Sequence, residues 1–165
     1  MADPSARFRL LMVEDDNADA MLIEEALCSR AEQLDITRAE DGVAALEYLS
    51  DPRHPRPDMI ILDLNMPRMN GRELLKILKR DPRLMTIPTI VLSTSEALAD
   101  VDGAYRDHAN AYVSKPVGLD DFVRAVRSLD EFFLQTALLA THAAEDSQSA
   151  GPGTGDASSD EAAAA

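Results

Sequence analysis

The chain is poor in aromatic residues, cysteine and basic residues, and each shortage excludes something. Aromatic residues make up 4% of the sequence and Trp is absent, so aliphatic side chains must fill the core. Cys28 is the only cysteine, which excludes an internal disulfide. We expect it to be a small, half-buried residue of a helix. The 30 acidic residues outnumber the 16 basic ones, for a net charge of −14, which argues against nucleic acid as a direct partner.

Long hydrophobic runs are also missing. No apolar stretch approaches the roughly 20 residues that a membrane-spanning helix needs. The first residues, Met1-Ala2-Asp3-Pro4, lack the basic and apolar regions of a signal peptide. We therefore expect a cytoplasmic protein with no membrane contact.

Apolar runs alternate with segments of helical period along most of the chain. The predicted strands are Phe8–Val13, Asp35–Ala39, Met59–Asp63, Thr89–Leu92 and Ala111–Ser114. The predicted helices are Ala18–Leu34, Val43–Leu49, Arg72–Arg80, Ala97–His108 and Leu119–Leu139. Met59–Leu62 is apolar at every position, which indicates a strand buried on both faces, as in parallel sheets. Right-handed crossovers between parallel strands place helices on both faces, so the pattern predicts a doubly wound α/β fold.

The composition divides the chain into an N-terminal arm (1–7), a folded domain (8–140) and a tail (141–165). In the tail Gly, Ser, Asp and Ala dominate, and there is no Lys or Arg. Such a segment cannot bury enough apolar surface to fold, so we predict an acidic, disordered tail. In the third helix we expect Leu74, Leu75, Ile77 and Leu78 to face the core.

Acidic residues stand where two of the predicted strands end. Glu14 and Asp15 follow the first strand, and Asp63 closes the third, with Asn65 two residues later. Ligands of open α/β sheets bind at the carboxyl ends of the strands, so these oxygen-bearing groups should converge. Carboxylate oxygens suit Mg²⁺. Taken alone, Glu14-Asp15-Asp16 could equally be acids that cap the following helix.

A hydroxyl and an amine follow the fourth and fifth strands, at Thr94 and Lys115. A carboxylate such as Asp63 can form an acyl phosphate, but acids alone would repel the incoming phosphoryl group. A divalent cation and the compact charge of Lys115 would offset that repulsion, and Thr94 would donate a hydrogen bond. A cis bond before Pro116 would aim the lysine inward.

The motifs at these strand ends resemble the receiver domain of two-component response regulators from about Phe8 to Leu139. They are Val13-Glu14-Asp15-Asp16, Leu62-Asp63-Leu64-Asn65-Met66-Pro67, Asn70-Gly71, Leu92-Ser93-Thr94-Ser95-Glu96 and Tyr112-Val113-Ser114-Lys115-Pro116. The resemblance implies a flavodoxin-like five-stranded parallel sheet of order 2-1-3-4-5, with helices on both faces.

The same resemblance implies a role for each site residue. Asp63 would be the phosphoacceptor. Asp15, Asp63 and the Asn65 carbonyl would ligate Mg²⁺, with Glu14 acting largely through water. Thr94 and Lys115 would receive the phosphoryl oxygens, and Tyr112 would swing inward when Thr94 moves.

Further motifs are similar to the short regulators paired with bacterial phytochromes. They are Arg56-Pro57-Asp58, Gly71-Arg72-Glu73, Ile87-Pro88 and Asn110-Ala111-Tyr112, beside the motif around Asp63. This similarity implies a bacteriophytochrome-type histidine kinase as phosphodonor and a homodimer formed through the fourth helix, fifth strand and fifth helix. The apolar end of the last helix fits a dimer or partner surface; its residues are Phe132, Phe133, Leu134, Leu138 and Leu139. His108 stands where the family usually has Gly, which predicts left-handed backbone strain.

Two other functions share this topology. An aspartyl-phosphate phosphatase or phosphotransferase would need a second acid two positions after its nucleophile, where this chain has Asn65. A flavin-binding electron carrier would need small hydroxyl-bearing residues after the first strand, where Glu14-Asp15-Asp16 would repel phosphate. We therefore expect a phosphoacceptor switch whose only catalysis is its own dephosphorylation.

Overall fold

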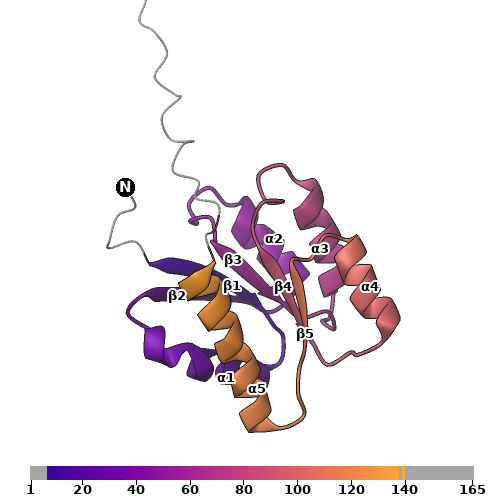
Figure 1. The fold of residues 1–165 in the computed structure, drawn as a ribbon. Helices are drawn as coiled ribbons and strands as arrows, with labels where there is room; N and C mark the ends of the chain where they lie inside the picture. The colour runs from indigo at the N-terminus through magenta and orange to yellow at the C-terminus, as the bar shows by residue number, and fades with distance from the viewer. Residues whose placement is uncertain (1–6, 138, 140–165) are drawn as a thin grey trace, which may run out of the picture.

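The computed structural model describes residues 7–137 and 139. Its centre is one parallel sheet in the order β2-β1-β3-β4-β5, which confirms the predicted order (Figure 1). The strands are β1 Phe8–Val13, β2 Leu34–Ala39, β3 Met59–Leu62, β4 Thr89–Ser93 and β5 Ala111–Ser114. The predicted tail lies outside the described residues, and so does the predicted arm except for Arg7.

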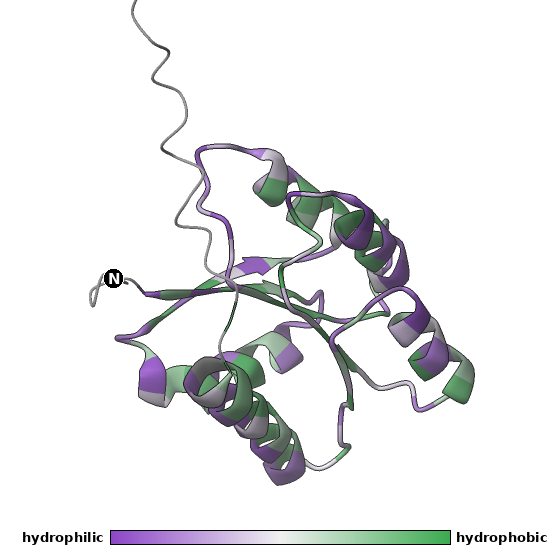
Figure 2. Cartoon of the chain, turned by 45° about the horizontal axis from the view of Figure 1, so that its top comes forward, coloured by the Kyte–Doolittle hydropathy of each residue, from purple (hydrophilic) through white to green (hydrophobic). Residues whose placement is uncertain are grey.

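Five α-helices cover the two faces of the sheet, as predicted. They are α1 Asn17–Leu27, α2 Gly42–Ser50, α3 Gly71–Arg80, α4 Leu98–Arg106 and α5 Leu119–Leu129. Ile23 of α1 and Phe122 of α5 belong to one buried cluster, whereas Leu75 of α3 and Ala104 of α4 belong to the other. Figure 2 shows the apolar sides of the helices turned toward the sheet. No helix among the described residues is long and apolar enough to cross a membrane.

The strand register brings several strand ends to one edge of the sheet. Val13 pairs with Leu62 across β1 and β3, and the Asp63 N–H donates to the Val13 carbonyl at 3.0 Å. Ser93 pairs with Ser114 across β4 and β5. The loops that carry the acids, Thr94 and Lys115 therefore start side by side.

The predicted first helix is wrong in its length. It ends at Leu27 and passes into a 3₁₀ turn at Cys28–Arg30. Between Leu27 and Leu34 no side chain is buried, so nothing apolar would hold a longer helix on the sheet. Leu34 instead starts β2 by pairing with Phe8. Cys28, expected to be half-buried, is exposed at this helix end.

The last helix also stops earlier than predicted. It is α-helical only to Leu129 and continues as a π-helix over Asp130–Thr136. The wider turn of the π-helix is consistent with a contact between residues five apart. The Gln135 side-chain amide donates to the buried Asp130 carboxylate, five residues earlier, at 3.1 Å. Leu138 lies outside the described residues.

Three smaller expectations have mixed outcomes. His108 has a φ of 66° after α4, which confirms the left-handed position predicted there. Ile77 was expected in the core but is 39% exposed, because Leu74, Leu75 and Leu78 already fill the buried side of α3. The described residues contain no cis peptide bond, so the bond before Pro116 is trans.

Candidate functional site

The loop between β1 and α1 divides its three acids between two tasks. The Asp16 carboxylate caps α1 by accepting from the N–H groups of Ala18 at 2.8 Å and Asp19 at 3.0 Å, and these bonds lower the pKa of Asp16. Glu14 is buried and Asp15 is exposed, and neither side chain caps the helix. The capping explanation therefore accounts for Asp16 only.

The carboxylates of Glu14, Asp15 and Asp63 meet at the sheet edge. One oxygen atom from each lies within 4.8 Å of the others. A site of three carboxylates, one of them open to solvent, provides the hard oxygen ligands that a small divalent cation prefers. The donor set therefore fits the predicted cation.

Lys115 holds the acids together through its buried ammonium group. Its side chain is only 4% exposed, and Nζ lies 2.6 Å from Glu14 Oε2, 2.8 Å from Asp19 Oδ2 and 3.6 Å from Asp63 Oδ2. A trans Pro116 follows, so the lysine reaches the site without a cis bond. A buried ammonium needs this pairing, since an isolated charge in the interior costs several kcal/mol.

Burial dominates the ionisation of the site. It raises the pKa values of Asp63 and Glu14 above their ordinary values, and the charge of Lys115 only partly opposes this. Burial would also lower the pKa of Lys115, but its hydrogen bonds to Asp19 and Glu14 outweigh burial and raise that pKa. The lysine therefore stays charged, whereas burial disfavours the ionised forms of the two carboxylates.

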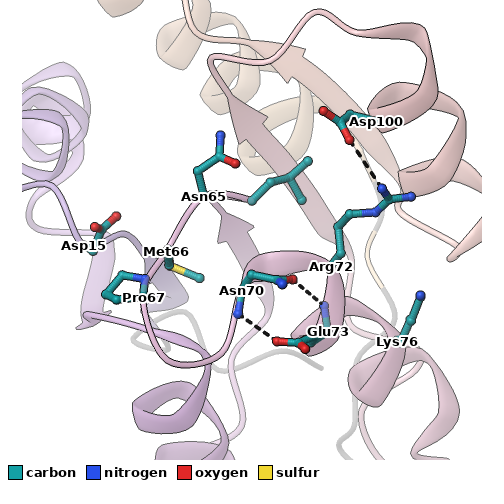
Figure 3. Close-up of a pocket in the computed structure, with 10 residues that line it drawn as sticks. Asp15, Asn65, Met66, Pro67, Asn70, Arg72, Glu73, Lys76 and Asp100 are labelled. Atoms are coloured by element: carbon teal, nitrogen blue, oxygen red, sulfur yellow. Dashed lines mark hydrogen bonds and ion pairs between the residues drawn. The ribbon is translucent and has the colours of Figure 1, made fainter.

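Asp63 sits at the start of a tightly built loop between β3 and α3. Its Oδ1 accepts from the Asn65 N–H at 3.3 Å, and the Gly71 N–H returns to the Leu64 carbonyl at 3.0 Å. Asn70 then caps α3 through a capping box with Glu73, drawn as two dashed lines in Figure 3. Asp15 and Asn65 line the same pocket beside this loop.

Thr94 and Tyr112 lie at the next strand ends. Thr94 is exposed directly after β4. The Tyr112 hydroxyl donates to the Ser95 carbonyl at 2.7 Å, so the ring already contacts the loop that carries Thr94. The Ser95 hydroxyl in turn donates to Asp100 of α4 at 2.6 Å, and Arg72 of α3 bonds the same carboxylate at 3.3 Å (Figure 3).

The site contains residues that the sequence patterns did not single out. Asp19 was missed as a partner of Lys115, because it lies in the first turn of α1 and not at a strand end. Arg38 of β2 was also missed; it bonds the β1–α1 loop. No local motif marks Arg38, because its contacts depend on how two strands pair.

Comparisons with known proteins agree with this geometry. Residues 10–127 match the family described as "Response regulator receiver domain". The response regulator Rcp1 of Synechocystis sp. is 37% identical over 134 residues, which cover 79% of this chain and 91% of the relative. A probable methanogenesis regulatory protein, FilR2 of Methanothrix harundinacea, is 42% identical over 134 residues, with 77% and 84% covered.

Solved structures show the same similarity in three dimensions. The Mn²⁺-bound form of Rcp1 superposes with a TM-score of 0.78 at 36% identity, covering 81% of this chain and 99% of that one. The phosphorylated cyanobacterial phytochrome response regulator RcpA gives a TM-score of 0.78 at 38% identity, covering 82% and 100%.

Proposed function

Because the chain belongs to the response regulator receiver domain family, we propose that Asp63 accepts a phosphoryl group from a histidine kinase. The observation that carries the proposal is the placement of Lys115 Nζ, which lies 3.6 Å from Asp63 Oδ2 at the sheet edge where the carboxylates of Glu14, Asp15 and Asp63 meet. A carboxylate nucleophile, a fixed positive charge and a set of cation ligands thus surround one point at the sheet edge.

In the proposed transfer, an Asp63 carboxylate oxygen attacks the phosphorus of a phosphohistidine. The new P–O bond forms as the P–N bond breaks, and the imidazole nitrogen keeps the electron pair of the broken bond. Lys115 exchanges part of its contact with Asp19 for a phosphoryl oxygen, since it already lies between the two carboxylates. Thr94 donates its hydroxyl to another oxygen.

A divalent cation, which we take to be Mg²⁺, would neutralise the carboxylates and the phosphoryl oxygens when it is bound. Glu14, Asp15 and Asp63 would hold it together with the Asn65 carbonyl. The Mn²⁺-bound relative supports a cation of this class, and the donor set of hard oxygens favours Mg²⁺.

Phosphorylation would switch a protein surface instead of starting a catalytic cycle on another molecule. The added charge and acceptor oxygens would draw Thr94 inward, and Tyr112 would then lose its bond to the displaced Ser95 carbonyl. The receiver domain would act as a regulator in the cytoplasm. Its net charge of −14 disfavours nucleic acid as a target, which leaves protein partners.

The phosphodonor we propose is a bacteriophytochrome-type kinase. Support comes from the phytochrome response regulator RcpA and from the bacteriophytochrome response regulator RtBRR, which is 35% identical. The phosphatase reading has less support, because the residue two positions after Asp63 is Asn65, which cannot act as a general acid.

Incubation with acetyl phosphate and Mg²⁺ tests the phosphoacceptor. Intact mass spectrometry of the wild type should show one added phosphoryl group that is lost again over time. Asp63→Asn should gain none, whereas Asp58→Asn, a carboxylate change before β3, should gain as much as wild type. Phosphorylation of Asp63→Asn to the wild-type extent would contradict the assignment.

A further inference from the structure

Arg38 lies on the edge strand β2 and clamps the loop that carries the acids. Its Nε donates to the Glu14 carbonyl at 2.9 Å, and Nη2 donates to the Asp15 carbonyl at 3.0 Å. Its Nη1 donates to Asn17 Oδ1 at 2.8 Å. One guanidinium thus bonds three residues of this connection: Glu14 and Asp15, which follow β1, and Asn17, the first residue of α1.

The position of this cation is subject to opposing electrostatic effects. It stands beside the N-terminus of α1, where the positive end of the helix dipole disfavours a cation, and next to acidic side chains such as Asp16, which attract it. Its charged hydrogen bonds to the two carbonyls and the Asn17 side chain add to that attraction. A lysine would supply the same charge but not the planar fork, so the geometry of the guanidinium is what this position uses.

The Asp15 carboxylate depends on its backbone for its position. Among the described residues no hydrogen bond or ion pair holds this side chain, and it is exposed. Glu14 is different, because Lys115 and the Asp16 N–H both bond its carboxylate. The Arg38 bond to the Asp15 carbonyl therefore restricts the one cation ligand that lacks support of its own.

We propose that Arg38 is a positioning residue, which fixes the Glu14 and Asp15 backbone so that their carboxylates and Asp63 form one divalent-cation site. This role rests on the proposed function, since it presupposes that the three carboxylates bind a cation. Partners that orient metal ligands typically contribute 10- to 100-fold in affinity, and Arg38 holds two ligands through their carbonyls.

Mn²⁺ binding to the full chain, measured by isothermal titration calorimetry, separates geometry from charge. Arg38→Lys keeps the charge and loses the fork, whereas Arg38→Gln loses both. We expect the dissociation constant of Mn²⁺ to rise about 10-fold or more in both variants. Arg53→Lys is the matched control, because Arg53 is 85% exposed and, among the described residues, pairs only with Asp51 after α2; the affinity of this variant for Mn²⁺ should equal that of wild type.

A second measurement needs no metal. Hydrogen–deuterium exchange of the metal-free protein should show faster exchange at residues 14–17 in Arg38→Lys but not in Arg53→Lys. Thermal unfolding confirms that each variant is folded, and Arg38→Lys alone carries the test if Arg38→Gln unfolds.

The outcomes distinguish a failure of the proposed cation site from a failure of the proposed role of Arg38. If wild type binds no Mn²⁺, the cation site itself is wrong. If wild type binds Mn²⁺ and Arg38→Lys binds it equally well with unchanged loop exchange, only the role of Arg38 is overturned. Tighter binding by Arg38→Gln with unchanged Arg38→Lys would mean that Arg38 acts through charge alone, which also contradicts positioning.

Discussion

At the scale of single residues, the site pairs one buried ammonium group with several carboxylates. Lys115 lies between Glu14, Asp19 and Asp63 with almost no contact with solvent. Without the ammonium, two buried carboxylates would face each other unpaired, and breaking such an arrangement typically costs 3–5 kcal/mol. The lysine therefore stabilises the resting protein as well as serving the proposed transfer.

Gly71 is required by how closely the chain passes Asp63. A Cβ at this position would lie 2.0 Å from the Asp63 carbonyl oxygen and 2.8 Å from the Leu64 Cα. Both are backbone atoms and cannot rotate away. We predict that Gly71→Ala lowers the free energy of unfolding by about 3 kcal/mol, near the upper end for overpacking, and slows phosphorylation because Asp63 must move.

Gly118→Ala provides the control for that prediction. Its added Cβ would meet only the flexible Asp121 carboxylate, at 3.4 Å. Urea denaturation should show a loss below about 1 kcal/mol for Gly118→Ala. Equal stability of the two alanine variants would show that the backbone at Gly71 relaxes without cost.

The sequence was sufficient to bring together residues whose position follows from a strand end. These residues stand at or just after strand ends: Glu14, Asp15, Asp63 and Lys115. The parallel sheet therefore brings them together whichever conformation the loops adopt. Asp19 and Arg38 could not be found this way. Their contacts depend on where α1 starts and how β2 pairs with β1, and neither follows from local pattern.

At the scale of elements, α3 and α4 are joined next to the proposed switch. Arg72 of α3 pairs with Asp100 of α4, and Ser95 bonds the same carboxylate. A Cβ at Gly103 would lie 1.6 Å from the Arg72 Nη2, so the absence of a side chain there lets the guanidinium rest against α4. The first turn of α4 and the loop carrying Thr94 are thus held in one position.

We predict that Asp100→Asn loosens the start of α4 without unfolding the protein. The ion pair is more than one-third exposed on both sides, so the global free energy of unfolding should fall by no more than about 1 kcal/mol. Amide exchange at residues 98–103 should nevertheless become faster, and mass spectrometry of peptic fragments would measure it.

Asp121→Asn is the corresponding control. Asp121 forms an exposed pair with Arg124 on α5, and its loss should leave exchange in α4 unchanged. Gly103→Ala should reproduce the Asp100→Asn effect by displacing Arg72. Unchanged exchange in both Asp100→Asn and Gly103→Ala would rule out this connection as a restraint on α4.

Element types were predictable, whereas helix ends were not. The five strands and five helices follow from apolar runs and helical period, and all ten exist. The end of α1 at Leu27 and the π-helix after Leu129 depend instead on tertiary contacts. Arg30, just after α1, pairs with the buried Asp130 at 3.1 Å. This ion pair connects the two helix ends whose positions were predicted wrongly.

At the scale of the whole molecule, the strand order places β5 at one edge of the sheet with α4 and α5 on either side (Figure 1). Large apolar side chains are exposed on these helices and on the π-helix that follows. They are Leu98, Tyr105, Leu119 and Phe132. Phe132 packs edge-on against the half-buried Phe133, with ring centroids 4.9 Å apart, which fixes its ring on the surface. Exposed apolar side chains on these elements fit the predicted homodimer.

We predict that the protein sediments as a dimer at micromolar concentration and that Phe132→Gln weakens this dimer. Phe132 is 56% exposed, and burying a Phe side chain is worth about 1.5–3 kcal/mol. The dissociation constant should therefore rise roughly 10- to 100-fold. Met21→Gln is the control, because Met21 is 68% exposed on α1, which is not one of the elements of the predicted interface, and its loss should leave the dimer intact. A wild type that remains monomeric both before and after treatment with acetyl phosphate and Mg²⁺ would contradict the dimer. Equal weakening by both variants would place the contact on another surface.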